Sequence, residues 1–314
     1  MSFKASAPGS MMLLGEYAVL HGKQALVCAV DKRITVTLTP REDTRIEIHS
    51  SIHGHYATEI AELSIERPFH FVLGALRQNQ SKLKRGCHID ITSEFSDKIG
   101  LGSSAAVTVA TLAVLANWLN LKVSLPELVR QGRNLVRQIQ GVGSGADIAA
   151  SVYGGIVGYS TQPLVVEKHA ITHPITALYA GYKTPTVDAI KKVHNYFSAY
   201  PVLYRHICNS IGQCAVEASR LVRMGEWKKI GEIMNTQQGM MESLGVSSSH
   251  LRNLVDNLRN QPGILGAKIS GSGMGDCVIG LGELPDDYVC TASQQGVELI
   301  PVKMTLQGVY CEKI

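Results

Sequence analysis

Strand-like patterns of hydrophobic and polar residues dominate the first part of the chain. Residues 11–14 form a short apolar run between two turns, the β-branched residues of 34–39 alternate with polar neighbours, and residues 45–49 alternate again. Together with the apolar run 26–30, these segments predict an early antiparallel meander. Further strands are predicted at 86–92, 156–159, 164–167 and 175–180.

Helical patterns prevail later in the chain. Small and aliphatic residues cover nearly every face of 107–119, which indicates a largely buried helix. The helix at 125–139 carries a start signal, with Ser124 as its cap and Glu127 three residues later. Further helices are predicted at 66–78, 186–193 with Thr186 as the cap, 203–224, 226–244 and 249–260. The shift from strands to helices indicates a boundary near residue 170, and we expect two domains, residues 1–170 and 171–314.

Composition and charge narrow the function classes. The 314 residues are 45% hydrophobic and 18% charged, which suits a globular protein with ample core. A formal charge of +4 is too small to indicate a nucleic-acid partner. Without an apolar signal segment or a run long enough to cross a membrane, the sequence predicts a cytoplasmic protein with no membrane partner. The cysteines are scattered, lack metal-site spacing and are expected to be reduced thiols: Cys28, Cys87, Cys208, Cys214, Cys277, Cys290 and Cys311.

Residues 98–106, which read KIGLGSSAA, carry the strongest chemical signal. A glycine-rich turn that opens a helix binds phosphate, because glycines let the backbone approach closely and the free N–H groups of the first helical turn point at the anion. The hydroxyls of Ser103 and Ser104 could bind a phosphate oxygen or magnesium. A plain loop capped by Ser103 would account for the same residues, but further glycine-rich segments favour the anion site. The stretch matches neither a Walker loop nor a dinucleotide fingerprint.

Two more glycine-rich segments and one polar loop complete the candidate chemistry. Asp147 follows three glycines at the start of a short predicted helix. It is either a first-turn acid stabilised by the helix dipole or a carboxylate open to a ligand, which could act as the base in phosphoryl transfer. Residues 266–281 predict a strand, a tight glycine turn and a strand. Glu16, Tyr17 and His21 follow the strand 11–14, where they project either into a binding site or into solvent.

These segments, in this order and spacing, resemble those of the GHMP small-molecule kinase superfamily over essentially the whole chain. The resemblance implies a two-domain α+β fold, with an N-terminal domain similar to domain 2 of ribosomal protein S5 and a ferredoxin-like C-terminal domain. It also implies that ATP, with Mg²⁺, lies in the cleft between the domains and phosphorylates a small molecule.

The resemblance also implies roles for individual residues. Asp147 matches the catalytic aspartate of the family, and Ser104 matches a magnesium ligand. The residues that would hold the triphosphate are Gly100, Leu101, Gly102, Ser103, Ser104 and Ala105. Those on the substrate side would be Glu16, His21, Thr186, Gly271, Ser272 and Gly273.

Three positions depart from the family pattern. Ser10 stands where this group usually has a lysine beside the aspartate, and Lys98 is our candidate to supply that charge. Val136 stands where a magnesium-binding glutamate is typical, and Met274 where the third motif usually has glycine. A nucleotide-binding homologue that has lost catalysis is therefore an alternative, although the retention of Asp147 in its glycine setting argues against it.

Within the superfamily, the sequence resembles the mevalonate and phosphomevalonate kinases of isoprenoid precursor biosynthesis. Residues 20–23 (LHGK) and 244–247 (LGVS) favour mevalonate as the acceptor. Residues 15–17 (GEY), Lys98 and residues 275–277 (GDC) instead resemble phosphomevalonate kinases. We expect phosphorylation of mevalonate, with phosphomevalonate as the alternative acceptor. The oligomeric state is left open, with a homodimer as one alternative.

Overall fold

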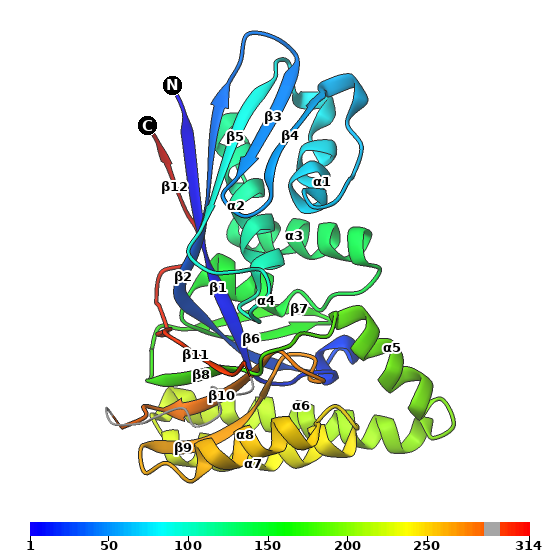
Figure 1. Ribbon diagram of the computed structural model, residues 1–314, viewed down its shortest axis with the longest axis vertical. Helices are drawn as coiled ribbons and strands as arrows, with labels where there is room; N and C mark the ends of the chain where they lie inside the picture. The colour runs from blue at the N-terminus through cyan, green and yellow to red at the C-terminus, as the bar shows by residue number, and fades with distance from the viewer. Residues whose placement is uncertain (286–295) are drawn as a thin grey trace.

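The computed structural model describes residues 1–285 and 296–314, which form two β-sheets with helices packed on them (Figure 1). The larger sheet contains β1 (Phe3–Leu14), β2 (Ala25–Pro40), β3 (Arg45–Ser50), β4 (Gly54–Glu59), β5 (Cys87–Ser93), β6 (Ile156–Thr161), β7 (Leu164–His169) and β12 (Tyr310–Lys313). Its order is β12-β1-β2-β5-β3-β4, and β6 pairs with β2 and β7. The smaller sheet contains β8 (Ile175–Tyr179), β9 (Ile264–Ser270), β10 (Cys277–Gly282) and β11 (Glu298–Ile300), in the order β11-β8-β10-β9.

The helices divide between the two sheets (Figure 1). The first group is α1 (His70–Gln78), α2 (Ser103–Trp118), α3 (Leu125–Gln140) and α4 (Ala146–Tyr153). In this group α2 and α4 pack on β1 and β2, while α1 and α3 pack on α2. The second group is α5 (Thr186–Phe197), α6 (Pro201–Met224), α7 (Trp227–Ser243) and α8 (Ser249–Arg259). There α7 and α8 pack on β9, and α6 lies between α7 and the larger sheet.

The central helix α2 is buried, as its sequence predicts. It carries no charged residue and contacts β1, β2 and the other three helices of its group. A helix that is apolar on all sides is stable only when it is surrounded by other elements. Packing therefore holds the first turn of α2, and the glycine turn before it, in a fixed position. The predicted cap of α3 is also confirmed, because Ser124 Oγ accepts a hydrogen bond from the Glu127 N–H at 3.4 Å.

The predicted meander of the early strands is wrong. The segments 26–30 and 34–39 are one continuous strand, β2, which runs through the charged residues between them. Strand β5 lies between β2 and β3, and β3 pairs with β5 in parallel. Local alternation identifies strands but does not say which strand is the neighbour. The first strand also begins earlier than predicted, at Phe3, and a register shift between Pro8 and Ser10 accommodates the proline.

The starts of α1 and α5 differ from the prediction. Helix α1 begins at His70 rather than at residue 66, after Pro68, which is consistent with the exclusion of a pre-proline residue from helical conformations. Thr186 is the first residue of α5 and not its cap, since no side chain caps this helix and Pro185 precedes it.

The change from the larger to the smaller sheet falls between β7, which ends at His169, and β8, which begins at Ile175. The domain limits 1–170 and 171–314 stay a prediction. One strand from the second half of the chain, β12, belongs to the larger sheet. Strand β12 pairs antiparallel with β1, so that the two ends of the chain lie side by side (Figure 1). Backbone hydrogen bonds of 2.8 and 2.9 Å join Ser2 and Ile314.

Six of the seven cysteines lie in the described residues, and all six are free thiols, as expected. Cys28, Cys87, Cys208 and Cys277 are buried, Cys214 is half-buried and Cys311 is exposed, while Cys290 lies outside the described residues. Among helices in the described ranges, none combines the length and apolar character that crossing a membrane requires.

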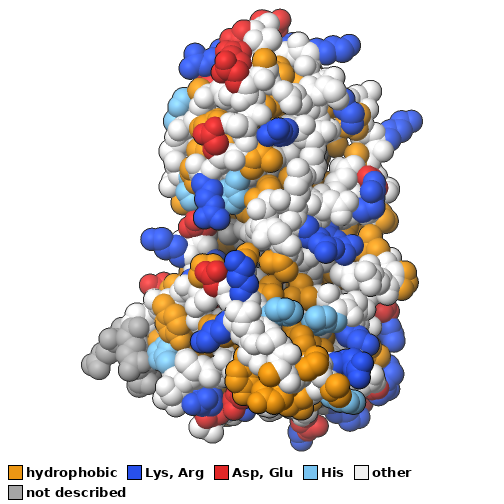
Figure 2. All heavy atoms as spheres, turned by 90° about the vertical axis from the view of Figure 1, so that its right-hand side faces the viewer, with side chains coloured by type: hydrophobic (Ala, Val, Ile, Leu, Met, Phe, Trp, Pro, Cys, Tyr) orange, Lys and Arg blue, Asp and Glu red, His pale blue; other side chains and the backbone are white. Residues whose placement is uncertain are grey.

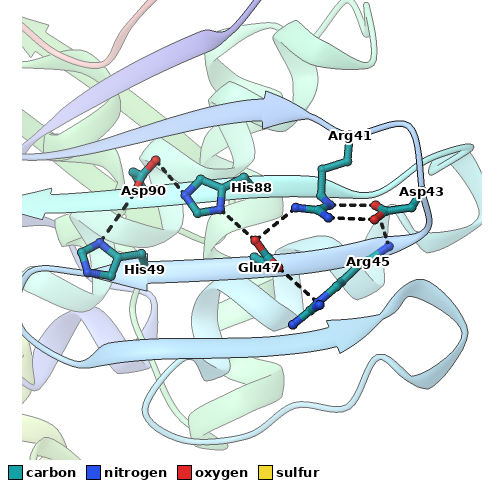
Figure 3. A network of polar contacts seen from close by, with 7 residues as sticks. All are labelled: Arg41, Asp43, Arg45, Glu47, His49, His88 and Asp90. Carbon is teal, nitrogen blue, oxygen red and sulfur yellow. Dashed lines mark hydrogen bonds and ion pairs between the residues drawn. The ribbon is translucent and has the colours of Figure 1, made fainter.

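A polar network covers the exposed side of the larger sheet where β2, β5 and β3 run together (Figure 3). Glu47 accepts from Arg41 at 3.1 Å, and also contacts Arg45 and His88. Asp90 links His88, at 3.1 Å, to His49. Exposed pairs of this kind contribute about 0–1 kcal/mol each to stability. Opposite charges face each other across neighbouring strands, and this pattern supports the strand register. In the described part of the chain, no cluster of three or more acidic, histidine or cysteine side chains could hold a metal.

Hydrophobic side chains gather on the lower part of the face that carries α5 (Figure 2). Exposed apolar residues of α5, α6 and their connection include Tyr196, Tyr200, Val202 and Leu203, each more than half exposed. Contiguous apolar surface of this kind is typical of protein contacts. The homodimer stays a prediction.

Candidate active site

The three glycine-rich segments meet in one cleft. It is lined by the inner end of β1, the turn before α2, the start of α4, the segment after β8 and the turn between β9 and β10. Of the residues predicted from sequence, those lining the cleft are Glu16, Gly100, Gly102, Ser103, Ser104, Ala105, Asp147, Thr186, Gly271 and Ser272. Those outside the lining are Leu101, Gly273, His21 and Lys98.

The turn before α2 needs its glycines for close approach. Gly102 has a φ of 65°, and a Cβ atom there would lie 2.3 Å from Ser10 Oγ. Leu101 has a fully buried side chain, and its carbonyl accepts a hydrogen bond from the Ser10 N–H at 3.0 Å. It anchors the turn to β1 and does not face the cleft. A helix leaves its first N–H groups without partners inside the helix, so those of α2 can bind an anion.

Asp147 is the second residue of α4 and faces Ser10 across the cleft floor. The Ser10 hydroxyl donates a hydrogen bond of 2.8 Å to Asp147 Oδ1. Burial raises the pKa of Asp147, the hydrogen bond from Ser10 opposes this effect, and the negative charge of Glu16 adds to it. A carboxylate with a raised pKa is a better proton acceptor than an ordinary one. Position 10 itself, where the resemblance led us to expect a lysine, carries the uncharged Ser10.

Sequence reasoning missed a buried ion pair under the cleft. Lys268 of β9 is fully buried, and its ammonium donates to Glu16 Oε1. The other Glu16 oxygen accepts from Gln237 Nε2 at 2.6 Å, and the Gly271 N–H also reaches Glu16 Oε1 at 3.3 Å. Burial lowers the pKa of Lys268, and Glu16 opposes that effect. Glu16 borders the cleft, but its carboxylate is occupied by protein partners, so it is not a free ligand for substrate. The visible signal was a lysine inside an otherwise apolar strand.

The turn between β9 and β10 is held in a strained conformation. Met274 and Asp276 have φ values of 60° and 70°, which non-glycine residues rarely adopt. The Met274 N–H donates to the Val246 carbonyl, and the Tyr17 hydroxyl donates to the Ser272 carbonyl at 2.6 Å. Gly273 packs against Val246, where a Cβ would lie 2.7 Å from the carbonyl, and therefore faces away from the cleft.

The remaining predicted residues separate by position. His21 is exposed, and its ring contacts the Tyr204 hydroxyl at 3.1 Å, away from the cleft lining. Lys98 is exposed and also outside the lining, whereas Lys183 lines the cleft. Thr186 lines the cleft from the first turn of α5.

Two protein-family models match segments of the chain that contain residues of the cleft. Residues 70–155 match the model of the GHMP kinases N terminal domain, and residues 215–287 match that of the GHMP kinases C terminal. The chain belongs to the GHMP kinase family. The match at 70–155 contains the glycine turn and Asp147, and the match at 215–287 contains the turn between β9 and β10. The protein is therefore an ATP-dependent small-molecule kinase with the two-part GHMP kinase fold.

Two curated relatives and two solved structures illustrate the similarity. The mevalonate kinase of Thermococcus sibiricus is 31% identical, covering 100% of this chain and 99% of its own. That of Pyrococcus furiosus is 30% identical, covering 93% and 92%. The structure of Lactococcus lactis galactokinase complexed with galactose superposes with a TM-score of 0.83 at 18% identity, covering 98% and 95%. The Methanococcus jannaschii mevalonate kinase has a TM-score of 0.78 at 21% identity, covering 96% and 98%.

Proposed function

We propose that this GHMP kinase transfers the γ-phosphoryl group of ATP to the C5 hydroxyl of mevalonate, in isoprenoid precursor biosynthesis. The observation that carries the proposal is similarity over the full chain to relatives described as mevalonate kinases. Fold similarity alone does not choose the acceptor, since a galactokinase superposes at least as well as a mevalonate kinase.

The charge of the cleft favours mevalonate over phosphomevalonate. An acceptor that already carries a phosphate needs more positive charge than one with a single carboxylate. The sequence offers Lys23, Lys98 and Lys183 for that purpose, and of these Lys183 alone lines the cleft. Lys23 packs its aliphatic stem against Gly212 of α6.

Asp147 is the base in this proposal, and the start of α2 is the phosphate site. The carboxylate orients the acceptor hydroxyl and takes its proton as the new bond to phosphorus forms. The N–H groups after Gly102 hold the triphosphate. Ser10 keeps Asp147 in place through its hydrogen bond.

The residues of the cleft fit a magnesium ion that is held mainly by nucleotide. Mg²⁺ in kinases takes one or two protein oxygens and several from phosphates and water. Ser104 supplies such an oxygen in the cleft lining, while Val136, which also lines the cleft, supplies none. When bound, the ion would neutralise charge on the phosphates.

An acceptor panel tests the function. Release of ADP, measured with mevalonate, phosphomevalonate, homoserine and galactose, should be rapid with mevalonate and near background with the others. Turnover of phosphomevalonate alone would move the assignment to the second acceptor. Turnover of neither compound, with ATP still bound, would support a nucleotide-binding protein without catalysis and reject our proposal.

Ser104→Ala tests the metal assignment. We expect the Mg²⁺ concentration for half-maximal activity to rise several-fold, because one of few protein oxygens is lost. Stability should change by less than about 1 kcal/mol, the value of a helix-cap hydroxyl, because the Ser104 hydroxyl makes no cap hydrogen bond at the start of α2. Activity measured against Mg²⁺ concentration, together with thermal melting, checks both. Ser103→Ala is the matched variant, and it should weaken ATP binding without moving the Mg²⁺ dependence. An unchanged Mg²⁺ dependence in Ser104→Ala would remove Ser104 from the metal site.

A further inference from the structure

Among the described residues that line the cleft, Lys183 is the one cation, and it faces an excess of negative charge. Glu16, Asp147 and Asp276 are the carboxylates of the lining. Lys268 pairs with Glu16, but neither Asp147 nor Asp276 has an ion-pair partner within 4 Å in the described ranges. A triphosphate entering beside these two groups is repelled unless a positive charge lies between them.

Lys183 reaches the phosphate site from the opposite side of the cleft. It lies between β8 and α5, and its Nζ donates a hydrogen bond of 2.9 Å to the carbonyl of Asp97, three residues before Gly100. One backbone carbonyl is a weak partner for an ammonium group, which has three donors. The ammonium therefore has donors available for a ligand.

Asp276 approaches the same glycine turn. A Cβ atom on Gly100 would lie 2.5 Å from Asp276 Oδ1, so the carboxylate touches the turn. This oxygen is buried and has no hydrogen-bond partner in the described part of the chain. Burial raises the pKa of Asp276 to about 6, the charge of Lys183 acts in the opposite direction, and Asp147 adds to the rise.

The backbone ties Asp276 to the segment that carries the lysine. The Asp276 N–H donates to the Tyr182 carbonyl at 2.8 Å, and the Asp276 carbonyl accepts from the Ala180 N–H at 2.8 Å. Asp276 also keeps a left-handed backbone, with a φ of 70°, which is unfavourable for a residue with a Cβ. An unpaired buried acceptor and a strained backbone at one residue point to a function.

We propose that Lys183 is the cation that contacts the transferring phosphoryl group, and that Asp276, whose carboxylate touches the glycine turn and whose backbone N–H bonds to Tyr182, is the positioning residue that attracts the ammonium of Lys183 toward that turn. The proposal rests on the kinase function proposed above. It replaces the expectation that Lys98 supplies this charge. The acceptor oxygen forms its bond to the γ-phosphorus, the bridging oxygen leaves with its electron pair as ADP, and the hydroxyl proton goes to Asp147. Lys183 stays protonated and stabilises charge on the phosphoryl oxygens.

Lys183→Met is the main test. We expect kcat to fall by about 10²–10³-fold, the usual loss when one preorganised charge partner is removed from a transition state. Melting temperature should not change, because Lys183 is exposed. Lys183→Arg should recover part of kcat. Lys192→Met, an exposed lysine of α5 outside the cleft lining, is the matched control and should behave as wild type. A large loss in Lys98→Met with a mild one in Lys183→Met would overturn the proposal.

A binding measurement separates this proposal from the choice of acceptor. Wild-type protein should prefer ATP to ADP in calorimetry, and Lys183→Met should reduce that preference by about tenfold, the scale of one hydrogen bond to a charged group. An unchanged preference would reject Lys183 as the phosphate contact even if no acceptor is turned over. Inactivity of wild-type protein on mevalonate, with the preference lost in Lys183→Met, would reject only the acceptor.

The role of Asp276 is tested by a double-mutant cycle. Asp276→Asn should lower kcat by about tenfold, and should cost little more in the Lys183→Met background, because two groups that act as a unit are non-additive. Additive losses would overturn the pairing and give Asp276 an independent role.

Discussion

Asp147→Asn is expected to lower turnover by about 10²–10⁴-fold, the scale of losing a general base, while ATP affinity stays within a few-fold of wild type. Asparagine keeps the size of the side chain and can still accept the hydrogen bond from Ser10, so the floor of the cleft should be preserved. What is lost is the oxygen that takes the acceptor proton. Steady-state kinetics and nucleotide titration on the same preparation measure both quantities.

The control is a second aspartate at the same position in a helix, the first turn. Asp188 is an acidic residue in the first turn of α5, as Asp147 is in the first turn of α4, but it is exposed and outside the cleft lining. Asp188→Asn should leave turnover unchanged. Full turnover in Asp147→Asn would eliminate the base from the mechanism, whatever the control shows.

Lys268→Met is expected to give the largest loss of stability, about 3–5 kcal/mol, which is typical of removing one partner from a buried ion pair. The change leaves the Glu16 carboxylate buried beside Gln237 and the Gly271 N–H without its cation. Urea unfolding should show a lower midpoint with an unchanged slope. Arg130→Met, which breaks an exposed pair with Glu127, is the control and should cost below about 1 kcal/mol.

The double change Glu16→Gln with Lys268→Met separates charge from packing. Removing both charges should recover much of the loss, because the uncompensated carboxylate is the main cost. If the double variant is less stable than Lys268→Met by the full cost of Glu16→Gln, the ion pair is not the cause of the destabilisation.

The sequence predicted those features that depend on neighbouring residues. The glycine turn before α2 was visible from residues 100–104 themselves, and the start of α3 follows from Ser124 and Glu127. Both signals lie within a few residues of the element that they define, which is why they can be found without a structure. The burial of α2 was equally visible, because all of its faces are apolar.

The missed features all depend on contacts between distant residues. The pairing of Glu16 with Lys268 joins positions 252 residues apart. The placement of β5 between β2 and β3 follows from the sheet as a whole. Which lysine lines the cleft is also a nonlocal property: Lys98 is next to the glycine turn in sequence but outside the cleft lining, while Lys183 lines it from the other side.

The pairing of β1 with β12 has a consequence for synthesis of the protein. During translation, β1 can pair with β2 early, but its outer edge stays open until residues 310–313 leave the ribosome. An open strand edge can capture a strand of another nascent chain. Because β1 also carries Ser10 into the cleft, capture at this edge would disturb the catalytic floor. In the folded protein, pairing with β12 covers this edge at Phe3–Ser6, at one end of the strand on which the active site is built.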